Sequence, residues 1–302
     1  MLCPRRCGVP RGEGFCGAAA EPEVASVCLH RGEEPPLNPI VNIFFAHCNL
    51  QCIYCQNRQI SLSDEFGVRS DELKNVNEIA DRVCQLITTH YPLSTIHSPL
   101  IGFVTAAHYA YAVRPIVEAV RARGIEPTVV YNSSGYESVD TLRTLEGVVD
   151  VYLPDLKYLD SDIAERYSHA PDYPEVATAA ILEMARQVGR GLKLDTDGIA
   201  YRGLLVRHLV LPGHTENSLR CLDWLADNLS LSSHLSIMAQ YFPPVEGLPA
   251  PLDRTVTADE YARVTDHAVA LGFSNIWTQE LTAQRNYRPD FTCTDNPFET
   301  QH

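Results

Sequence analysis

The sequence predicts an α/β protein built around a parallel sheet. Short runs rich in β-branched and aromatic residues recur after residue 40, and helical patterns separate them. Several of the runs are apolar almost throughout. Strands of that composition are buried on both faces, which is typical of a parallel sheet covered by helices.

Six strands are expected in chain order, each with the composition of a buried strand. They lie at 41–46, 100–106, 127–132, 149–155, 204–211 and 235–242. The helical patterns between them lie at 71–91, 113–124, 138–147, 173–189 and 218–230. Periodicity by itself leaves open whether the strands form a Rossmann-type sheet or an open barrel.

Three segments are expected along the chain. Residues 1–40 form a cysteine-rich amino-terminal extension, whose Pro, Gly and Arg content rules out a long helix. Residues 41–245 form the main domain, and 246–302 supply a carboxyl-terminal helix, a short strand and a tail. The polar stretch after Trp277 is expected to lie on the domain as a tail or to be partly disordered.

Composition favours a cytoplasmic enzyme. A chain of 302 residues with 45% hydrophobic residues can bury a large core. No apolar run approaches the roughly 20 residues of a membrane span, and the first residues lack a secretory signal. A net charge of −14 disfavours nucleic acid as a partner. Seven of the ten cysteines precede residue 56, which indicates metal binding in a reducing compartment.

Cys48, Cys52 and Cys55 form the most informative motif, with the spacing C-x3-C-x2-C. Such spacing brings three thiolates to one loop, so a cubane iron-sulfur cluster held there would keep one iron open for chemistry. The alternatives are a zinc site and disulfides. Structural zinc normally takes four ligands in two separated pairs, and disulfides belong to an oxidising compartment. We therefore expect an iron-sulfur cluster.

The segment CNLQCIYCQN, with Tyr54 just before the last cysteine, resembles the radical S-adenosylmethionine (SAM) enzymes. That resemblance implies a [4Fe-4S] cluster on Cys48, Cys52 and Cys55, with SAM on the fourth iron. It also implies reductive cleavage of SAM to methionine and a 5'-deoxyadenosyl radical, which abstracts a hydrogen atom from the substrate. A low-potential donor such as flavodoxin or ferredoxin is the implied electron source.

Further segments are similar to the branch of that family related to pyruvate formate-lyase activating enzyme. They include CPRRCGV at 3–9, HRGEEPPL at 30–37, YNSSGYESVDTL at 131–142, VDVYLPDLKY at 149–158 and RGLLVRHLVLPG at 202–213. The resemblance implies a six-stranded partial TIM barrel. The cluster loop would follow the first barrel strand, at the carboxyl end where barrel chemistry takes place.

The same resemblance implies a set of SAM and cation contacts after the strands. These are Tyr54, Thr105, Asn132, Ser133, Asp155, Lys157 and Arg207. The chain departs from the pattern in three places. Thr105 to His108 replace a Gly-Gly-Glu segment, Asn132 replaces an aspartate cation ligand, and Gln240 and Tyr241 stand where a SAM-contacting histidine is expected. The partner of Arg207 is either SAM or a carboxylate of a neighbouring strand.

Two features lie outside the barrel. Cys3, Cys7 and Cys16, with Cys28 further on, are candidates for a second metal, either zinc or an auxiliary cluster. The segment with His30, Glu33 and Glu34 is either a solvated charge run or a substrate or docking element.

The predicted function is that of a radical SAM enzyme, which would activate a glycyl-radical enzyme or modify another protein. One alternative is an iron-sulfur or zinc protein that transfers electrons without cleaving SAM. Another is modification of a small metabolite. An open barrel favours a protein substrate over a small molecule. Neither nucleic acid nor a membrane is expected as a partner.

Overall fold

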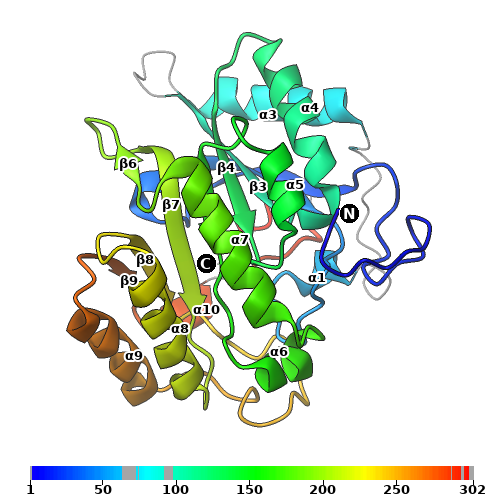
Figure 1. Ribbon diagram of the computed structural model, residues 1–302. Helices are drawn as coiled ribbons and strands as arrows, with labels where there is room; N and C mark the ends of the chain where they lie inside the picture. Colours follow the sequence, from blue (N-terminus) through cyan, green and yellow to red (C-terminus); the bar gives the residue numbers. More distant parts are fainter. Residues whose placement is uncertain are drawn as a thin grey trace.

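The computed structural model describes residues 2–62, 73, 75–91, 98–286, 288–293 and 296–298. Its strands form one open sheet, and helices pack along the outer side of the strands (Figure 1). The strand order is β1-β2-β3-β4-β5-β7-β8-β9, and the short β6 pairs with β7. All neighbours from β2 to β9 along this order are parallel, which confirms the expected α/β class and the partial barrel.

The strands have these bounds: β1 Val24–His30, β2 Ile40–Phe45, β3 Leu100–Val104, β4 Thr128–Ser133, β5 Val151–Pro154, β6 Lys193–Leu194, β7 Ala200–Leu209, β8 His234–Met238 and β9 Asn275–Thr278. The predicted strands correspond to β2, β3, β4, β5, β7 and β8. Every residue of β2 and β3 is buried, as their near-continuous apolar sequences predict.

The helices have these bounds: α1 Arg58–Ser61, α3 Val76–His90, α4 Ala110–Arg121, α5 Val139–Thr144, α6 Ser161–Ser168, α7 Tyr173–Val188, α8 Thr215–Asn228, α9 Ala258–Leu271 and α10 Ala283–Asn286. The structure also has two 3-10 turns, at Pro35–Leu37 and Ala107–Tyr109. The expected helix at 71–91 begins at Val76, and 71, 72 and 74 lie outside the described residues.

β1 and α6 differ from the sequence expectation. β1, which the sequence assigned to the amino-terminal extension, pairs antiparallel with β2 and extends the barrel sheet at its edge. α6 was not expected, because its mean hydropathy is low. Asp160 caps its amino-terminal end, where the Asp160 carboxylate accepts hydrogen bonds from the amides of Asp162 and Ile163. The barrel therefore begins before residue 40.

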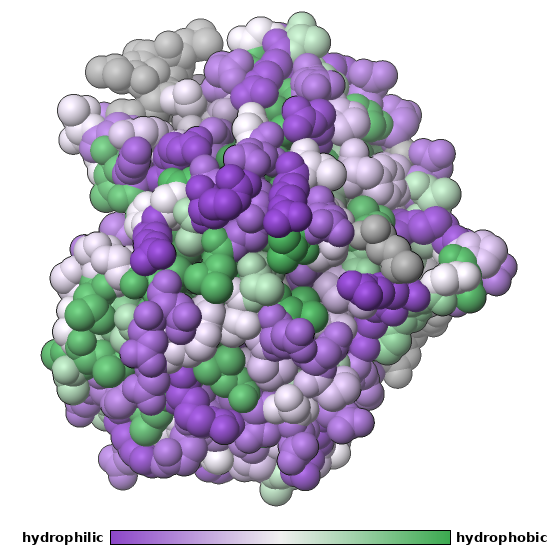
Figure 2. Space-filling model, viewed as in Figure 1, coloured by the Kyte–Doolittle hydropathy of each residue, from purple (hydrophilic) through white to green (hydrophobic). Residues whose placement is uncertain are grey.

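Helix starts and the core fix this arrangement. At α9 the Thr257 side chain accepts from the amide of Glu260, whose carboxylate accepts from the amide of Thr257. A large apolar core fills the space between the strands and the outer helices. On the face shown in Figure 2, apolar residues form scattered areas among polar ones. No helix in the described part of the chain is long and apolar enough to span a bilayer.

Candidate functional site

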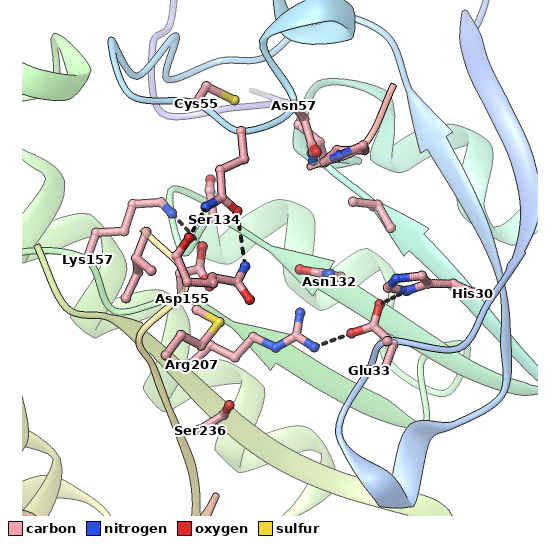
Figure 3. A pocket seen from close by; sticks show the side chains of 18 of the residues that line it. His30, Glu33, Cys55, Asn57, Asn132, Ser134, Asp155, Lys157, Arg207 and Ser236 are labelled. Atoms are coloured by element: carbon pink, nitrogen blue, oxygen red, sulfur yellow. Dashed lines mark hydrogen bonds and ion pairs between the residues drawn. The ribbon is translucent and has the colours of Figure 1, made fainter. Parts of the chain in front are cut away.

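A cavity of about 430 Å³ lies at the carboxyl ends of the parallel strands. Parallel strands end at the same edge of the sheet, so the segments that follow them meet there. The register shows this directly, because Phe44 of β2 pairs with Val104 of β3, and Val104 pairs with Asn132 of β4. The segments after β2, β3, β4 and β5 all contribute to the lining of the cavity, as do β7, β8 and β9 (Figure 3).

Cys48, Cys52 and Cys55 all line this cavity, in the loop that follows β2. Cys48 and Cys52 are buried, and Cys55 is half-buried. Burial raises the pKa of Cys48 to about 11 and that of Cys52 to about 12, and the neighbouring thiols add to both shifts. Three neighbouring thiols of this kind lose their protons when they bind a cationic metal centre, because the positive centre compensates the negative charge of the thiolates.

The donor set consists of three cysteine sulfurs, which are the ligands that iron-sulfur clusters take. Among the described residues, no group of three or more His, Cys, Asp or Glu side chains could hold a metal ion as it stands. In a cubane cluster each cysteine sulfur binds a different iron, so the sulfurs stand further apart than the ligands of one ion. The cysteines line a shared cavity, and the chemistry of the donors therefore suits an iron-sulfur cluster.

A chain of buried hydroxyls leads from Tyr54 to a cysteine sulfur. The Tyr54 hydroxyl bonds that of Tyr158, which lies 2.8 Å from the Ser168 Oγ. Ser168 Oγ donates to Cys52 Sγ over 2.9 Å. Tyr54 also lines the cavity, as the sequence resemblance implies. Ser168, at the end of α6, was not predicted, because no local motif marks a serine that bonds a sulfur 116 residues away.

Asp155 and Lys157 form a close pair in the cavity wall after β5. Lys157 Nζ donates to Asp155 Oδ2 over 2.5 Å, and the side chains are only 14% and 19% exposed. Although burial opposes ionisation of Lys157, the carboxylate of Asp155 and the nearby Cys52 raise its pKa well above the usual range. The charge of Lys157 in turn opposes the rise that burial causes in the pKa of Cys52. Lys157 is thus charged, and it lies beside the cysteines (Figure 3).

Arg207, on β7, pairs with two acids from the other end of the chain. Its Nε donates to Glu34 Oε1 over 2.9 Å, and its Nη2 bonds both Glu34 and Glu33. Its expected partner was SAM or a carboxylate of a neighbouring strand. The acids that it bonds lie in the loop between β1 and β2, which the sequence left open as a solvated charge run or a substrate or docking element. Arg207 also lines the cavity, and its contact with SAM stays a prediction. Burial opposes these charges, but Arg207 keeps the pKa of Glu33 low.

His30 and Asn42 complete this buried charge network. Asn42 Nδ2 donates to Glu33 Oε1 over 2.9 Å, and His30 Nδ1 lies 3.0 Å from the same oxygen. The neighbouring strand leaves space for Asn42, since a Cβ on Gly102 would lie 2.0 Å from Asn42 Oδ1. A polar residue inside the apolar strand Ile40–Phe45 was the sequence signal for this network.

Thr105 and Asn132 line the cavity as predicted, but Ser133 does not. Ser133 Oγ donates to the buried Glu137 over 2.7 Å. Successive side chains of a strand point to opposite sides, so Ser134 lines the cavity in its place. Thr105 has φ +59, a strained conformation for a β-branched residue that is common at functional sites.

His108 and Tyr241 lie in the protein interior. His108 is 1% exposed, its Nε2 lies 2.7 Å from the Ala46 carbonyl, and burial lowers its pKa to about 3. It is therefore neutral and supports the backbone just before the cysteine loop. The Tyr241 hydroxyl donates to the Leu252 carbonyl. Of the two residues expected at the end of the sixth predicted strand, only Gln240 lines the cavity.

An amide network that the sequence did not indicate joins the cysteine loop to the last strands. Gln56 Nε2 donates to the Gln240 carbonyl over 2.9 Å, and Gln279 Nε2 donates to Gln240 Oε1 over 2.8 Å. The described part of the carboxyl-terminal tail also reaches the cavity, where Pro289 and Phe298 are part of the lining. The remainder of the predicted tail, including 299–302, lies outside the described residues.

Three of the amino-terminal cysteines lie in one segment. Burial raises the pKa of Cys3, and both Cys7 and Cys16 are close enough to add to that shift. Cys28 lies apart from them, on β1, among Phe44 and other apolar side chains. The described residues hold no group of three or more His, Cys, Asp or Glu side chains arranged around one ion, and the second metal site stays a prediction.

The chain is similar to a protein of known sequence and to several solved structures. An uncharacterized protein of Methanocaldococcus jannaschii is 29% identical over 273 residues, covering 88% of this chain and 73% of the relative. A domain of the pyruvate-formate lyase-activating enzyme from Bacteroides vulgatus is 14% identical at TM-score 0.38, covering 57% of this chain and 92% of that one. Methylornithine synthase is 11% identical at TM-score 0.46, covering 84% and 73%. No protein-family model matches the chain.

Proposed function

We propose that this protein is a radical SAM enzyme, which cleaves SAM reductively and abstracts a hydrogen atom from a substrate. One observation carries the proposal: the three cysteines of the C-x3-C-x2-C motif line the same cavity as Thr105 and the Asp155–Lys157 pair. A protein that only transferred electrons would need no polar cavity beside its cluster. The size of the cavity suits one drug-sized ligand, as SAM is.

The roles of the residues follow from their positions. Cys48, Cys52 and Cys55 would hold a [4Fe-4S] cluster, which when bound supplies the electron that cleaves SAM to methionine and a 5'-deoxyadenosyl radical. Lys157 would bind the carboxylate of SAM as a charged donor, and Asp155 orients the ammonium group of Lys157. The buried walls exclude water, which protects a reactive species from side reactions.

The proposed substrate is a protein, with activation of a glycyl-radical enzyme as one form. The support is the open sheet, whose edge strands β1 and β9 do not pair with each other in the strand order. Modification of a small metabolite is the competing proposal. A cavity of about 430 Å³, with Pro289 and Phe298 in its lining, has the size of a small-molecule site and therefore favours a small metabolite as the substrate. A polypeptide would have to displace this tail.

The test of the proposed function is a triple variant, with Cys48, Cys52 and Cys55 each changed to Ala. Anaerobically reconstituted wild-type protein should show the EPR signal of one reduced [4Fe-4S] cluster, which changes on addition of SAM. The triple variant should lose that SAM-responsive signal, whereas Cys84→Ala, on α3, should retain it. A SAM-responsive signal that survives in the triple variant would overturn the assignment.

A further inference from the structure

The amino-terminal segment lies directly on the back of the cysteine loop. Arg5 Nε donates to the carbonyl of Asn49, and Gln51 Nε2 donates to the carbonyl of Phe15 over 2.7 Å. Asn49 and Gln51 lie between Cys48 and Cys52. In Figure 1 this segment, in dark blue, lies beside the part of the chain that leads into α1.

Short contacts lead from the surface of this segment to a cysteine sulfur. The Phe15 ring is 36% exposed, and the Arg5 guanidinium carbon lies 3.8 Å from its centre. Arg5 Nη2 donates to the Ser168 carbonyl over 3.1 Å. Ser168 Oγ donates to Cys52 Sγ over 2.9 Å. Two residues, Arg5 and Ser168, thus lie between the Phe15 ring and Cys52.

The exposed surface here combines apolar and basic groups. Val9 is 48% exposed, and it lies close to Gly14, which precedes Phe15. Arg6 is also exposed. Residues 2–16 carry three arginines, Arg5, Arg6 and Arg11, against one acid, Glu13, in a chain of net charge −14. Exposed aromatic and arginine side chains are enriched in protein interfaces, and a locally basic surface attracts an acidic partner.

We propose that Arg6, Val9 and Phe15 form the docking surface for an acidic one-electron donor protein, which reduces the cluster through Arg5 and Ser168. The step transfers one electron: the donor is oxidised by one electron, and the [4Fe-4S] cluster is reduced from the 2+ to the 1+ state. The inference rests on the proposed function, since it needs a cluster at Cys48, Cys52 and Cys55. It assigns to the amino-terminal segment a role that does not require its cysteines to bind metal.

The test uses the reconstituted enzyme with flavodoxin as the acidic donor. Arg6→Glu should weaken flavodoxin binding in calorimetry, and slow cluster reduction by flavodoxin hydroquinone in stopped flow, by about tenfold at low salt. Both effects should shrink at high salt because screening weakens exposed charges. Arg190→Glu, the same charge change at an exposed arginine after α7, is the matched control and should change both quantities by less than about twofold.

A second variant tests the apolar part of the surface. Val9→Asp adds a negative charge without removing any bond of the segment, and it should also weaken flavodoxin binding. Equal affinity and equal reduction rates for wild type, Arg6→Glu and Val9→Asp would overturn the docking proposal. Reduction by dithionite, a small reductant, separates this failure from that of the proposed function. If dithionite-reduced wild-type enzyme does not cleave SAM, the proposed function fails instead.

Discussion

Charged side chains in the cavity form ion pairs with partners that are distant in sequence. Arg207 is the clearest case, because its two carboxylate partners lie more than 170 residues earlier in the chain. Removing Arg207 alone would take the shared cation from two buried acids. Breaking a buried ion pair in this way typically costs 3–5 kcal/mol, so the network fixes the loop between β1 and β2 at the cavity. Arg207 bonds two carboxylates and Lys157 bonds one, which makes Lys157 the better candidate for an anionic ligand.

Lys157→Met should weaken SAM binding by about tenfold or more, because a hydrogen bond to a charged group contributes roughly 1.5–3 kcal/mol. Calorimetry on the reconstituted enzyme measures this affinity, and iron analysis should show unchanged cluster content. The variant also leaves Asp155 unpaired and partly buried, which lowers thermal stability.

The double variant Lys157→Met/Asp155→Asn separates binding from stability. It should recover the thermal stability, since no unpaired charge remains, but it should not recover SAM affinity. If SAM affinity is unchanged in Lys157→Met, this lysine is not a SAM ligand.

At the scale of elements, the described part of the carboxyl-terminal tail acts as a cover at the cavity. The Phe298 ring lies 4.2 Å from the His30 ring and 5.8 Å from that of Phe44, and Phe291 packs on Phe44 at 5.3 Å. Asn296 Nδ2 donates to the Leu29 carbonyl over 2.9 Å. A chain end held by ring contacts and single hydrogen bonds opens at lower free-energy cost than a core helix.

Phe298→Ala should therefore expose the cavity. In the cluster-free protein, we expect iodoacetamide to alkylate Cys55 several-fold faster in this variant, as measured by mass spectrometry of the labelled peptide. Tyr201→Ala, at an exposed tyrosine of β7, is the control and should leave the rate unchanged. An unchanged rate in Phe298→Ala would show that the tail does not limit access.

At the scale of the whole molecule, Glu137 couples stability to pH near neutrality. This carboxyl is buried between β4 and α5, where Ser133 and Tyr131 donate to Oε1. No partner of Oε2 is found among the described residues. Burial raises the pKa of Glu137 from 4.5 to about 7, even though the two hydroxyl donors act in the opposite direction.

The sign of the effect follows from proton binding. Between pH 4.5 and pH 7 the folded protein holds a proton on Glu137 that the unfolded chain has lost, so this group's contribution to stability falls as pH rises. Glu137→Gln should remove this loss of stability with rising pH, because glutamine does not titrate. Relative to wild type, its free energy of unfolding in urea should increase between pH 5 and pH 8 by roughly 3 kcal/mol at most.

The control for this measurement is Glu175→Gln, at an exposed acid of α7, which should track wild type over the whole pH range. A pH-independent difference between Glu137→Gln and wild type would contradict the raised pKa.

The sequence by itself determined the α/β class, the six barrel strands and the cysteine motif. Strand composition and a fixed cysteine spacing are local properties, so they can be read along the chain. The positions of Thr105, Asn132, Asp155 and Lys157 also followed, because side chains after parallel strands meet at one edge of the sheet.

Only the tertiary structure decided which of these side chains meet, and what else lines the cavity. It placed Ser134 there instead of Ser133, because successive side chains along and just after β4 point to opposite sides, so that Asn132 and Ser134 face the cavity and Ser133 faces away from it. It paired Arg207 with Glu33 and Glu34, and it joined β1 to the sheet. Such contacts join residues far apart in the chain, and they depend on packing that no local pattern encodes.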